Sequence, residues 1–333
     1  MRHILRRIIF YLVALWASVT LNFFIPRLAP GDPAQALLGR FERQGPISPA
    51  ALKALQAAFG IDTHDPLWVQ YVSYLHNLLT GNLGLSFTYY PTAVSDVISQ
   101  DIRWSLVLGS VAVVISFSLG CLIGIFMAWR RGSIFDATIS PLMTFISAIP
   151  YFWLALIILY IFGFRLGWFP FSDGYDTTLD IGWTPAFITS AIYHAILPAL
   201  TLIISSIAGW MLVMRNSMIT TLSEDYILMA QAKGLSSRRI MFAYAARNAI
   251  LPNVTGFALA IGFVVSGQLL TEIVFSYPGI GFSLLQAVQG QDYPLLQGIF
   301  LIIAAAVMGA NFLADLLYVV LDPRVRLDRG AEA

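Results

Sequence analysis

Charged residues are scarce in this chain of 333 residues. They make up 11% of the sequence, whereas hydrophobic residues make up 58%. Soluble domains contain about 25% charged and about 45–50% apolar residues, so a soluble fold of this length could not bury so much apolar surface. The net charge is +1, which gives no indication of a nucleic-acid partner. The composition therefore indicates a membrane protein.

Chemically reactive residues are also few, and this excludes most kinds of catalytic site. The single cysteine, Cys121, allows neither a disulfide framework nor a cysteine-based metal site, and we interpret it as a packing or lipid-facing residue. Lys53 and Lys233 do not follow a glycine, so the chain lacks the phosphate-binding loop G-x-x-x-x-G-K-[ST]. The four histidines are scattered. We predict no catalytic, cofactor-binding or metal site and expect that the chain is not an enzyme.

Six apolar segments are long enough to cross a bilayer, which takes about 20 apolar residues. They are approximately Ile8 to Leu28, Trp104 to Trp129, Ile139 to Phe164, Ala186 to Met214, Ile250 to Glu272 and Pro294 to Leu321. Lipid offers the backbone no hydrogen-bond partners, so each segment is expected to be helical, and none alternates like a barrel strand. The first run is too long for a cleaved signal. The sequence predicts an all-α membrane protein with six transmembrane helices.

The arginines predict the orientation, because cytoplasmic loops hold the excess of positive residues. If the N-terminus is inside, thirteen of the nineteen Lys and Arg residues fall on the inner side. The N- and C-termini are then both cytoplasmic. The predicted organisation is an N-terminal transmembrane helix (1–28), an outer loop with short helices (29–103), a five-helix core (104–321) that includes an inner loop (215–249), and a cytoplasmic tail (322–333).

The long outer loop carries two helix signals. Ser48 and Pro49 begin the first, which ends before Gly60. The second runs from Pro66 to Leu79 and is amphipathic. Its apolar residues at helical spacing are Trp68, Val69, Val72, Leu75 and Leu79. The pattern leaves open whether this layer covers the membrane spans or docks a delivery protein. The shorter outer loop, residues 165–185, is acidic, and we interpret its acids as a solvated face rather than a calcium site.

The predicted spans have no ionisable residue at their centres. His194, Arg165, Glu272 and Asp315 all lie within a few turns of a span end, where a polar tip can reach the interface or a cavity. A proton- or sodium-coupled carrier is expected to keep a carboxylate or a broken-helix ion site near the midplane. The pattern therefore disfavours a carrier, although glycines in the fifth span would permit local distortion.

The inner loop between the fourth and fifth spans predicts two helices at a corner. Ser223 is placed to cap the first helix, which Gly234 ends, and Ser236 is placed to cap the second, which runs toward Pro252. Small residues keep the first helix slender, and its predicted apolar projections are Tyr226, Ile227, Met229 and Leu235. Such a helix suits a groove on a partner protein. The alternative is an amphipathic hairpin that rests on lipid headgroups.

Two stretches of this loop resemble the coupling loop of dipeptide and oligopeptide ABC transporter permeases. Residues 224–236 read EDYILMAQAKGLS and residues 246–252 read ARNAILP. Further matches are APGDP at 29–33, GNLG at 81–84, RGSIFD at 131–136 and TEIVFSYPG at 271–279. The chain departs from the general importer pattern E-A-A-x-x-x-G in having Leu228 and Met229 where Glu and Ala would stand, and the peptide-importer branch shares this departure.

The resemblance implies the transmembrane domain of a type I ABC importer in a bacterial or archaeal plasma membrane. The implied partners are a second homologous permease in a heterodimer, two ATP-binding subunits and an extracytoplasmic solute-binding protein, without nucleic acid. ATP and Mg would bind the partner subunits, and this chain would hold no cofactor. The residues to which the resemblance assigns coupling to the ATPase are Asp225, Tyr226, Ala230, Ala232, Lys233, Gly234, Leu235, Ser236 and Arg238.

The cargo is the least constrained expectation. Members of the resembled family import peptides, nickel chelates or oligosaccharides such as cello-oligomers. Eight tryptophans would suit stacking on sugar rings, but tryptophan also gathers at membrane interfaces for physical reasons. We therefore expect peptides first, with oligosaccharides and nickel chelates as alternatives. A secondary carrier or a channel, in which the inner loop only gates, is the alternative of a different class.

Overall fold

The computed structural model describes residues 2–28, 66–264 and 268–321. Helices dominate these residues, and they contain no β-strand beyond an isolated bridge between Leu85 and Ala93. The predicted all-α fold is confirmed. The helix predicted between Ser48 and Gly60 lies outside the described residues. The chain divides into two compact units, one of residues 1–105, 265–269 and 278–312, and one of residues 106–264, 270–277 and 313–333.

The first unit contains α1 (Arg2–Leu28), α4 (Leu67–Leu79), the start of α5 (Val94–Trp129), α14 (Ile280–Gln289) and most of α15 (Tyr293–Leu321). Its core lies where α5, α14 and α15 meet. Val94, Ile280, Leu295 and Ile299 are fully buried there. Reciprocal hydrogen bonds between Asn22 and Gln297 join α1 to α15, at 2.7 and 3.3 Å.

Helix α4 confirms the amphipathic helix predicted for Pro66 to Leu79, but the face that packs is not the predicted apolar one. Tyr71 and Tyr74 place their rings 5.2 and 5.4 Å from the ring of Phe23 in α1. Trp68 and Val72, from the predicted apolar face, are instead 70% and 57% exposed. The tyrosine face packs because its rings meet a phenylalanine that is itself fully buried.

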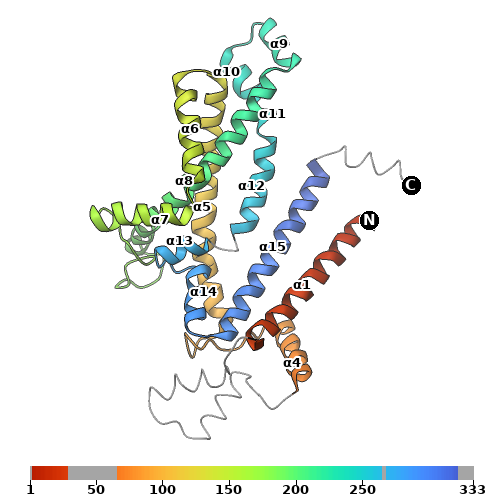
Figure 1. Cartoon of the computed structure of the whole chain (residues 1–333), viewed down its shortest axis with the longest axis vertical. Helices are drawn as coiled ribbons and strands as arrows, with labels where there is room; N and C mark the ends of the chain where they lie inside the picture. Colours follow the sequence, from red (N-terminus) through yellow and green to blue (C-terminus); the bar gives the residue numbers. More distant parts are fainter. Residues whose placement is uncertain (1, 29–65, 265–267, 322–333) are drawn as a thin grey trace. The chain divides into compact units, whose positions relative to one another are not determined.

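The second unit holds the rest of α5 and a series of helices that follow it. These are α6 (Ile134–Ala148), α7 (Tyr151–Ile158), the π-helix η1 (Leu159–Arg165), α8 (Pro185–Leu222), α9 (Asp225–Ala232), α10 (Ser237–Arg239), the π-helix η2 (Ile240–Ala246), α11 (Arg247–Ala249), α12 (Leu251–Val264) and α13 (Leu269–Val274). Helices α6 and α7 both pack against α8. In Figure 1, α6 runs beside α8 and α7 turns away from the direction of α6.

Four described helices are long and apolar enough to cross a membrane. They are Arg6–Phe24 within α1, the whole of α5, the whole of α8, and Tyr293–Leu313 within α15. They correspond to four of the six predicted spans. The predicted fifth span, Ile250 to Glu272, contains α12 and the start of α13, with residues 265–267 outside the described ones. The count of six stays a prediction.

The predicted third span, Ile139 to Phe164, is wrong as a continuous helix. It consists of α6 and the stretch Tyr151–Arg165, which are bent by 98° at a short break. Pro150 causes the break, because proline disfavours the helical conformation of the residue before it. Ile149 accordingly has an extended ψ of 124°. This pair counts as one further span only if the bent helices are taken together.

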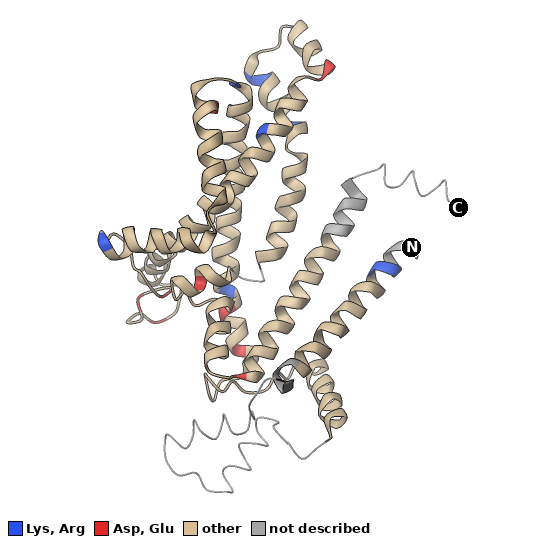
Figure 2. Ribbon diagram, in the orientation of Figure 1, with Lys and Arg blue, Asp and Glu red and all other residues tan. Residues whose placement is uncertain are grey.

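Charged residues avoid the long helices of the second unit. Figure 2 shows α8 and α12 almost entirely without charge, and Arg215 is the only Lys, Arg, Asp or Glu in α8. The expectation that Glu272 reaches an interface or a cavity is wrong, because its side chain in α13 is fully buried.

Candidate coupling surface

Two residues, Ser223 and Glu224, separate α9 from the end of α8, and the cap predicted for α9 is wrong. Ser223 caps the end of α8 instead, since its hydroxyl donates to the carbonyl of Thr220 at 2.7 Å. Glu224, which is extended, precedes α9 and makes no side-chain capping bond. The reason is that α8 continues eight residues beyond Met214, where the apolar pattern stops. The first residues of the predicted inner loop are therefore the last two turns of α8.

The end of α9 is as predicted. Gly234 has a φ of +71°, the left-handed conformation that favours glycine. The amide of Leu235 donates to the carbonyl of Ala230 at 3.3 Å, and the amide of Gly234 donates to that of Gln231 at 2.9 Å. Together these bonds close the helix end and direct the chain into the following turn.

One face of α9 is buried against α8 and η2. Ile227 and Ala230 are 0% and 2% exposed and belong to one cluster with Met214 and Met218 of α8. The prediction that Ile227 projects outward is wrong, and Ala230 is also on the inner face. Residues three apart share a face of a helix, so these two form the contact. The buried cluster also includes Ile240, Met241, Ala245 and Ala246 of η2 and Ala249 of α11.

The opposite face of α9 is open. We call it the α9 surface and define it by the exposed residues Asp225, Tyr226, Leu228, Met229, Ala232 and Lys233. Leu228 and Met229 are 56% and 61% exposed, although large apolar side chains favour burial. The phenol of Tyr226 accepts a hydrogen bond from the Asn248 side chain at 2.8 Å, which fixes the tyrosine at the edge of this surface.

The predicted coupling residues therefore divide by burial. Seven are exposed, Leu235 is half-buried and Ala230 is buried. The exposed ones are Asp225, Tyr226, Ala232, Lys233, Gly234, Ser236 and Arg238. Leu228 and Met229 were missing from the predicted set of coupling residues, although both are exposed and Met229 was among the predicted apolar projections. Ser236 precedes α10 as predicted, without a side-chain capping bond.

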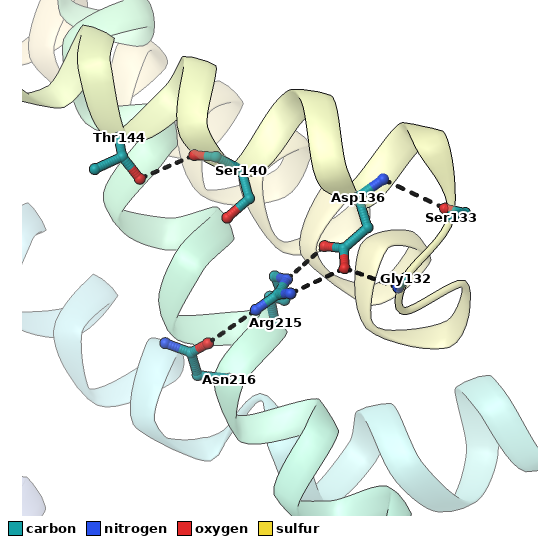
Figure 3. A network of polar contacts seen from close by, with 7 residues as sticks. All are labelled: Gly132, Ser133, Asp136, Ser140, Thr144, Arg215 and Asn216. Atoms are coloured by element: carbon teal, nitrogen blue, oxygen red, sulfur yellow. Dashed lines mark hydrogen bonds and ion pairs between the residues drawn. The ribbon is translucent and has the colours of Figure 1, made fainter.

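An ion pair that the sequence reasoning missed lies near the end of α8 (Figure 3). Arg215 donates from Nε to Oδ1 of Asp136 at 2.6 Å and from Nη2 to Oδ2 at 2.9 Å. The amide of Gly132 donates to the same Oδ2 at 3.1 Å, and Ser133 caps α6 by accepting from the Asp136 amide at 3.3 Å. The Arg215 hydrogen bond is the main reason why the pKa of the Asp136 carboxyl is below its ordinary value.

Comparison with known proteins connects these features to a family. The profile described as binding-protein-dependent transport system inner membrane component matches residues 120–327, and the profile of the N-terminal part of such components matches residues 1–117. The chain belongs to this family. It is accordingly a multi-pass permease subunit of the inner membrane that works in an ABC importer with a solute-binding protein, and the predicted resemblance is confirmed.

Relatives match along nearly the whole chain. The Di/tripeptide transport system permease protein DppB of Pseudomonas aeruginosa (strain UCBPP-PA14) is 34% identical, over 98% of this chain and 99% of the relative. The Oligopeptide transport system permease protein AppB of Bacillus subtilis (strain 168) is 33% identical over 97% and 98%. The Dipeptide transport system permease protein DppB of Escherichia coli (strain K12) is 33% identical over 98% and 99%.

Proposed function

We propose that this chain forms one half of a translocation pathway for peptides. The support for this cargo is that three relatives named for di/tripeptide, oligopeptide and dipeptide transport match almost the whole chain. Peptides therefore take precedence over cello-oligomers and nickel chelates. The other half of the pathway is a second homologous permease, and a solute-binding protein delivers the peptide from outside.

The motive force comes from two separate ATP-binding subunits. ATP and Mg bind to those subunits, because this chain has no Gly-Lys pair for a phosphate-binding loop. A ligand shifts a conformational equilibrium only by its differential affinity for the two states. Nucleotide binding must therefore change how the ATP-binding subunits contact this chain. The contact surface must also be packed against a transmembrane helix, so that a displacement of the surface displaces the helix.

The α9 surface is the observation that carries this proposal. A short helix fixed from behind by Ile227 and Ala230 presents Tyr226, Leu228 and Met229 outward. An apolar projection of this kind fits a hydrophobic groove on a partner. Pressure on the surface acts directly on Met214 and Met218, because the buried cluster contains both α9 and the end of α8. The coupling residues are those of the α9 surface together with Gly234, Leu235, Ser236 and Arg238, with Ala230 as their inner support.

The proposed coupling requires α9 to be cytoplasmic, as the arginine distribution predicts. Fusions of a periplasm-active reporter at Asp176 and a cytoplasm-active reporter at Arg238 test this. Both reporters should be active. The reverse pattern would exclude contact between the α9 surface and a cytoplasmic ATPase.

Purification and transport assays test the function itself. Extraction in mild detergent should yield this chain together with a nucleotide-hydrolysing subunit, and vesicles that hold the complex should take up trialanine only with ATP and the binding protein. Uphill uptake by this chain alone on an ion gradient would establish the carrier instead. Mass spectrometry of the ligand that stays on the binding protein identifies the cargo, and a cello-oligomer or a nickel chelate there would replace the peptide assignment.

A further inference from the structure

The Asp136 carboxylate is engaged more completely than a surface ion pair would be. Its two oxygens receive Nε and Nη2 of Arg215 and the amide of Gly132. The Asp136 side chain is only 6% exposed and that of Arg215 is 20% exposed. Paired bonds from a guanidinium to a carboxylate fix direction as well as distance. The pair therefore holds α6 to α8 in one defined orientation (Figure 3).

Few of the side chains of α6 are buried. Asp136 is the only buried residue among its 15 residues, all of which are described. The neighbouring Ile134 and Phe135 are 87% and 42% exposed, and Phe145 near the other end is 67% exposed. The described members of the cluster that fixes α9 come from α5, α8, α9, η2 and α11, and none comes from α6. The apolar cluster that joins α9 to α8 thus contains no residue of α6, although α6 also packs against α8 along its length.

The part of α8 that carries Arg215 is directly continuous with α9. Arg215 is seven residues before Leu222, where α8 ends, and only Ser223 and Glu224 separate the two helices. Both linking residues are tied to the last turn of α8, because their amides donate to the carbonyls of Thr220 and Thr221 at 3.1 and 3.2 Å. A displacement of α9 is therefore a displacement of the segment that holds Arg215.

We propose that the Asp136–Arg215 pair is the link through which α8 carries the bent helix pair α6–α7 when the α9 surface is moved. This inference rests on the proposed function. Asp136 and Arg215 are positioning residues, since neither belongs to the α9 surface. Apolar side chains exposed to lipid can slide along a neighbour at little cost, because lipid is as apolar as they are. The two charge-assisted hydrogen bonds between Arg215 and Asp136 resist that sliding and keep α6 and α8 in register during each transport cycle.

The test uses the whole complex in vesicles, with ATP hydrolysis and uptake of radiolabelled trialanine measured on the same sample. Asp136→Asn removes the negative charge of the pair. Arg215→Lys keeps the positive charge but loses the two parallel hydrogen bonds that a guanidinium makes to a carboxylate. Both should raise the ATP hydrolysed per trialanine imported by about tenfold, which is within the range of ordinary coupling free energies, while binding protein still stimulates hydrolysis. Arg130→Gln is the matched control, because it removes an exposed arginine from the turn that precedes α6, and its ratio should not change.

A merely structural role gives a different result. If the pair only stabilises the fold, uptake and stimulated hydrolysis fall together with the amount of assembled complex, and an unchanged ratio overturns the link. The exchange Asp136→Arg with Arg215→Asp adds a second measurement, since it should couple better than either single substitution if the two side chains act as a pair. Absence of that recovery also overturns the link. A wild-type complex that imports no trialanine with ATP instead contradicts the proposed function, and the link falls with it.

Discussion

A Cβ atom placed on Gly124 would lie 2.5 Å from the carbonyl oxygen of Met211, so α5 and α8 meet backbone to backbone. Gly120, one turn earlier on the same face, would place its Cβ 2.7 Å from Cβ of Trp210. Two small residues four positions apart are the usual means by which membrane helices approach this closely. Between them lies Cys121, which is buried and accepts a hydrogen bond from Asn253 at 3.1 Å.

Substituting Gly124→Ala should destabilise the subunit, because the backbone of α8 cannot move away as a flexible side chain could. We expect a loss of about 1–3 kcal/mol, the usual cost of overpacking. The measurement is the fraction of monodisperse complex that survives heating in detergent. Gly209→Ala is the control, since nothing lies within 4 Å of its Cβ position, and it should be neutral or slightly stabilising. Equal behaviour of the two variants would contradict the close approach.

The all-α fold, the four long spans and the family could be predicted because each depends on a signal that extends over many residues. Apolar runs of about 20 residues need no tertiary information. The boundaries were less predictable. Helix α5 begins at Val94, ten residues before Trp104, and α8 continues past Met214 to Leu222. In both cases polar residues end the apolar run without ending the helix.

Asp292 should be a strong determinant of the first unit. It is fully buried, and its carboxylate accepts from the Ser86 hydroxyl at 2.5 Å and from the amides of Thr88 and Leu295 at 2.8 and 3.1 Å. Asp292→Asn replaces one accepting carboxylate oxygen with an NH₂ group, which cannot accept a hydrogen bond. We therefore expect the free energy of unfolding to fall by about 1–3 kcal/mol. The thermal midpoint of the detergent-solubilised complex measures it. Asp180→Asn, at an exposed position outside the helices, should leave the midpoint unchanged.

The ion pair between Asp136 and Arg215 predicts a specific response to acid. The pKa of Asp136 is lowered by the hydrogen bond from Arg215 and also by that from Gly132. A carboxyl with a lowered folded pKa stabilises fully above its unfolded pKa, about 4, and the contribution is lost as the pH falls through the folded value. The difference in thermal midpoint between wild type and Asp136→Asn should therefore be constant from about pH 5 to pH 8 and shrink below about pH 4.

A substitution that does not titrate supplies the control for the acid experiment. Ser140→Ala, one turn further along α6, should change the thermal midpoint by the same amount at every pH. A difference between wild type and Asp136→Asn that persists at the lowest pH would show that shape rather than charge determines the contribution of Asp136.

The sequence predicted well where the helix of the coupling region ends, but it did not predict which face of that helix is buried. Gly234 was placed correctly because a left-handed helix end has a strong residue preference. Ile227 was assigned to the outside because an eight-residue helix with apolar residues on all sides has no amphipathic pattern to follow. The Asp136–Arg215 pair was missed because its members are 79 residues apart and only the tertiary packing of α6 on α8 brings them together.

Gly234 gives the sharpest test of the α9 surface. Its Cβ position is open, with nothing within 4 Å, so the cost of a substitution there comes from its φ of +71°. A residue with a Cβ atom costs about 1–2 kcal/mol in this conformation, and asparagine and aspartate adopt it more readily than other residues but less readily than glycine. Gly234→Asp should insert normally in the membrane but lose most ATP-driven trialanine uptake, because it strains the turn and adds a charge beside the surface.

Two matched variants separate strain from charge at Gly234. Gly234→Asn has the same size as Gly234→Asp but no charge, so it should retain more uptake, and the loss that remains measures the strain of the turn. Gly182→Asp adds the same side chain at a glycine that is also open but has no positive φ, and it should transport as wild type does. Membrane insertion is measured by the amount of each variant in washed membranes. Normal binding-protein-stimulated uptake by Gly234→Asp would mean that the turn after α9 does not transmit force to the spans.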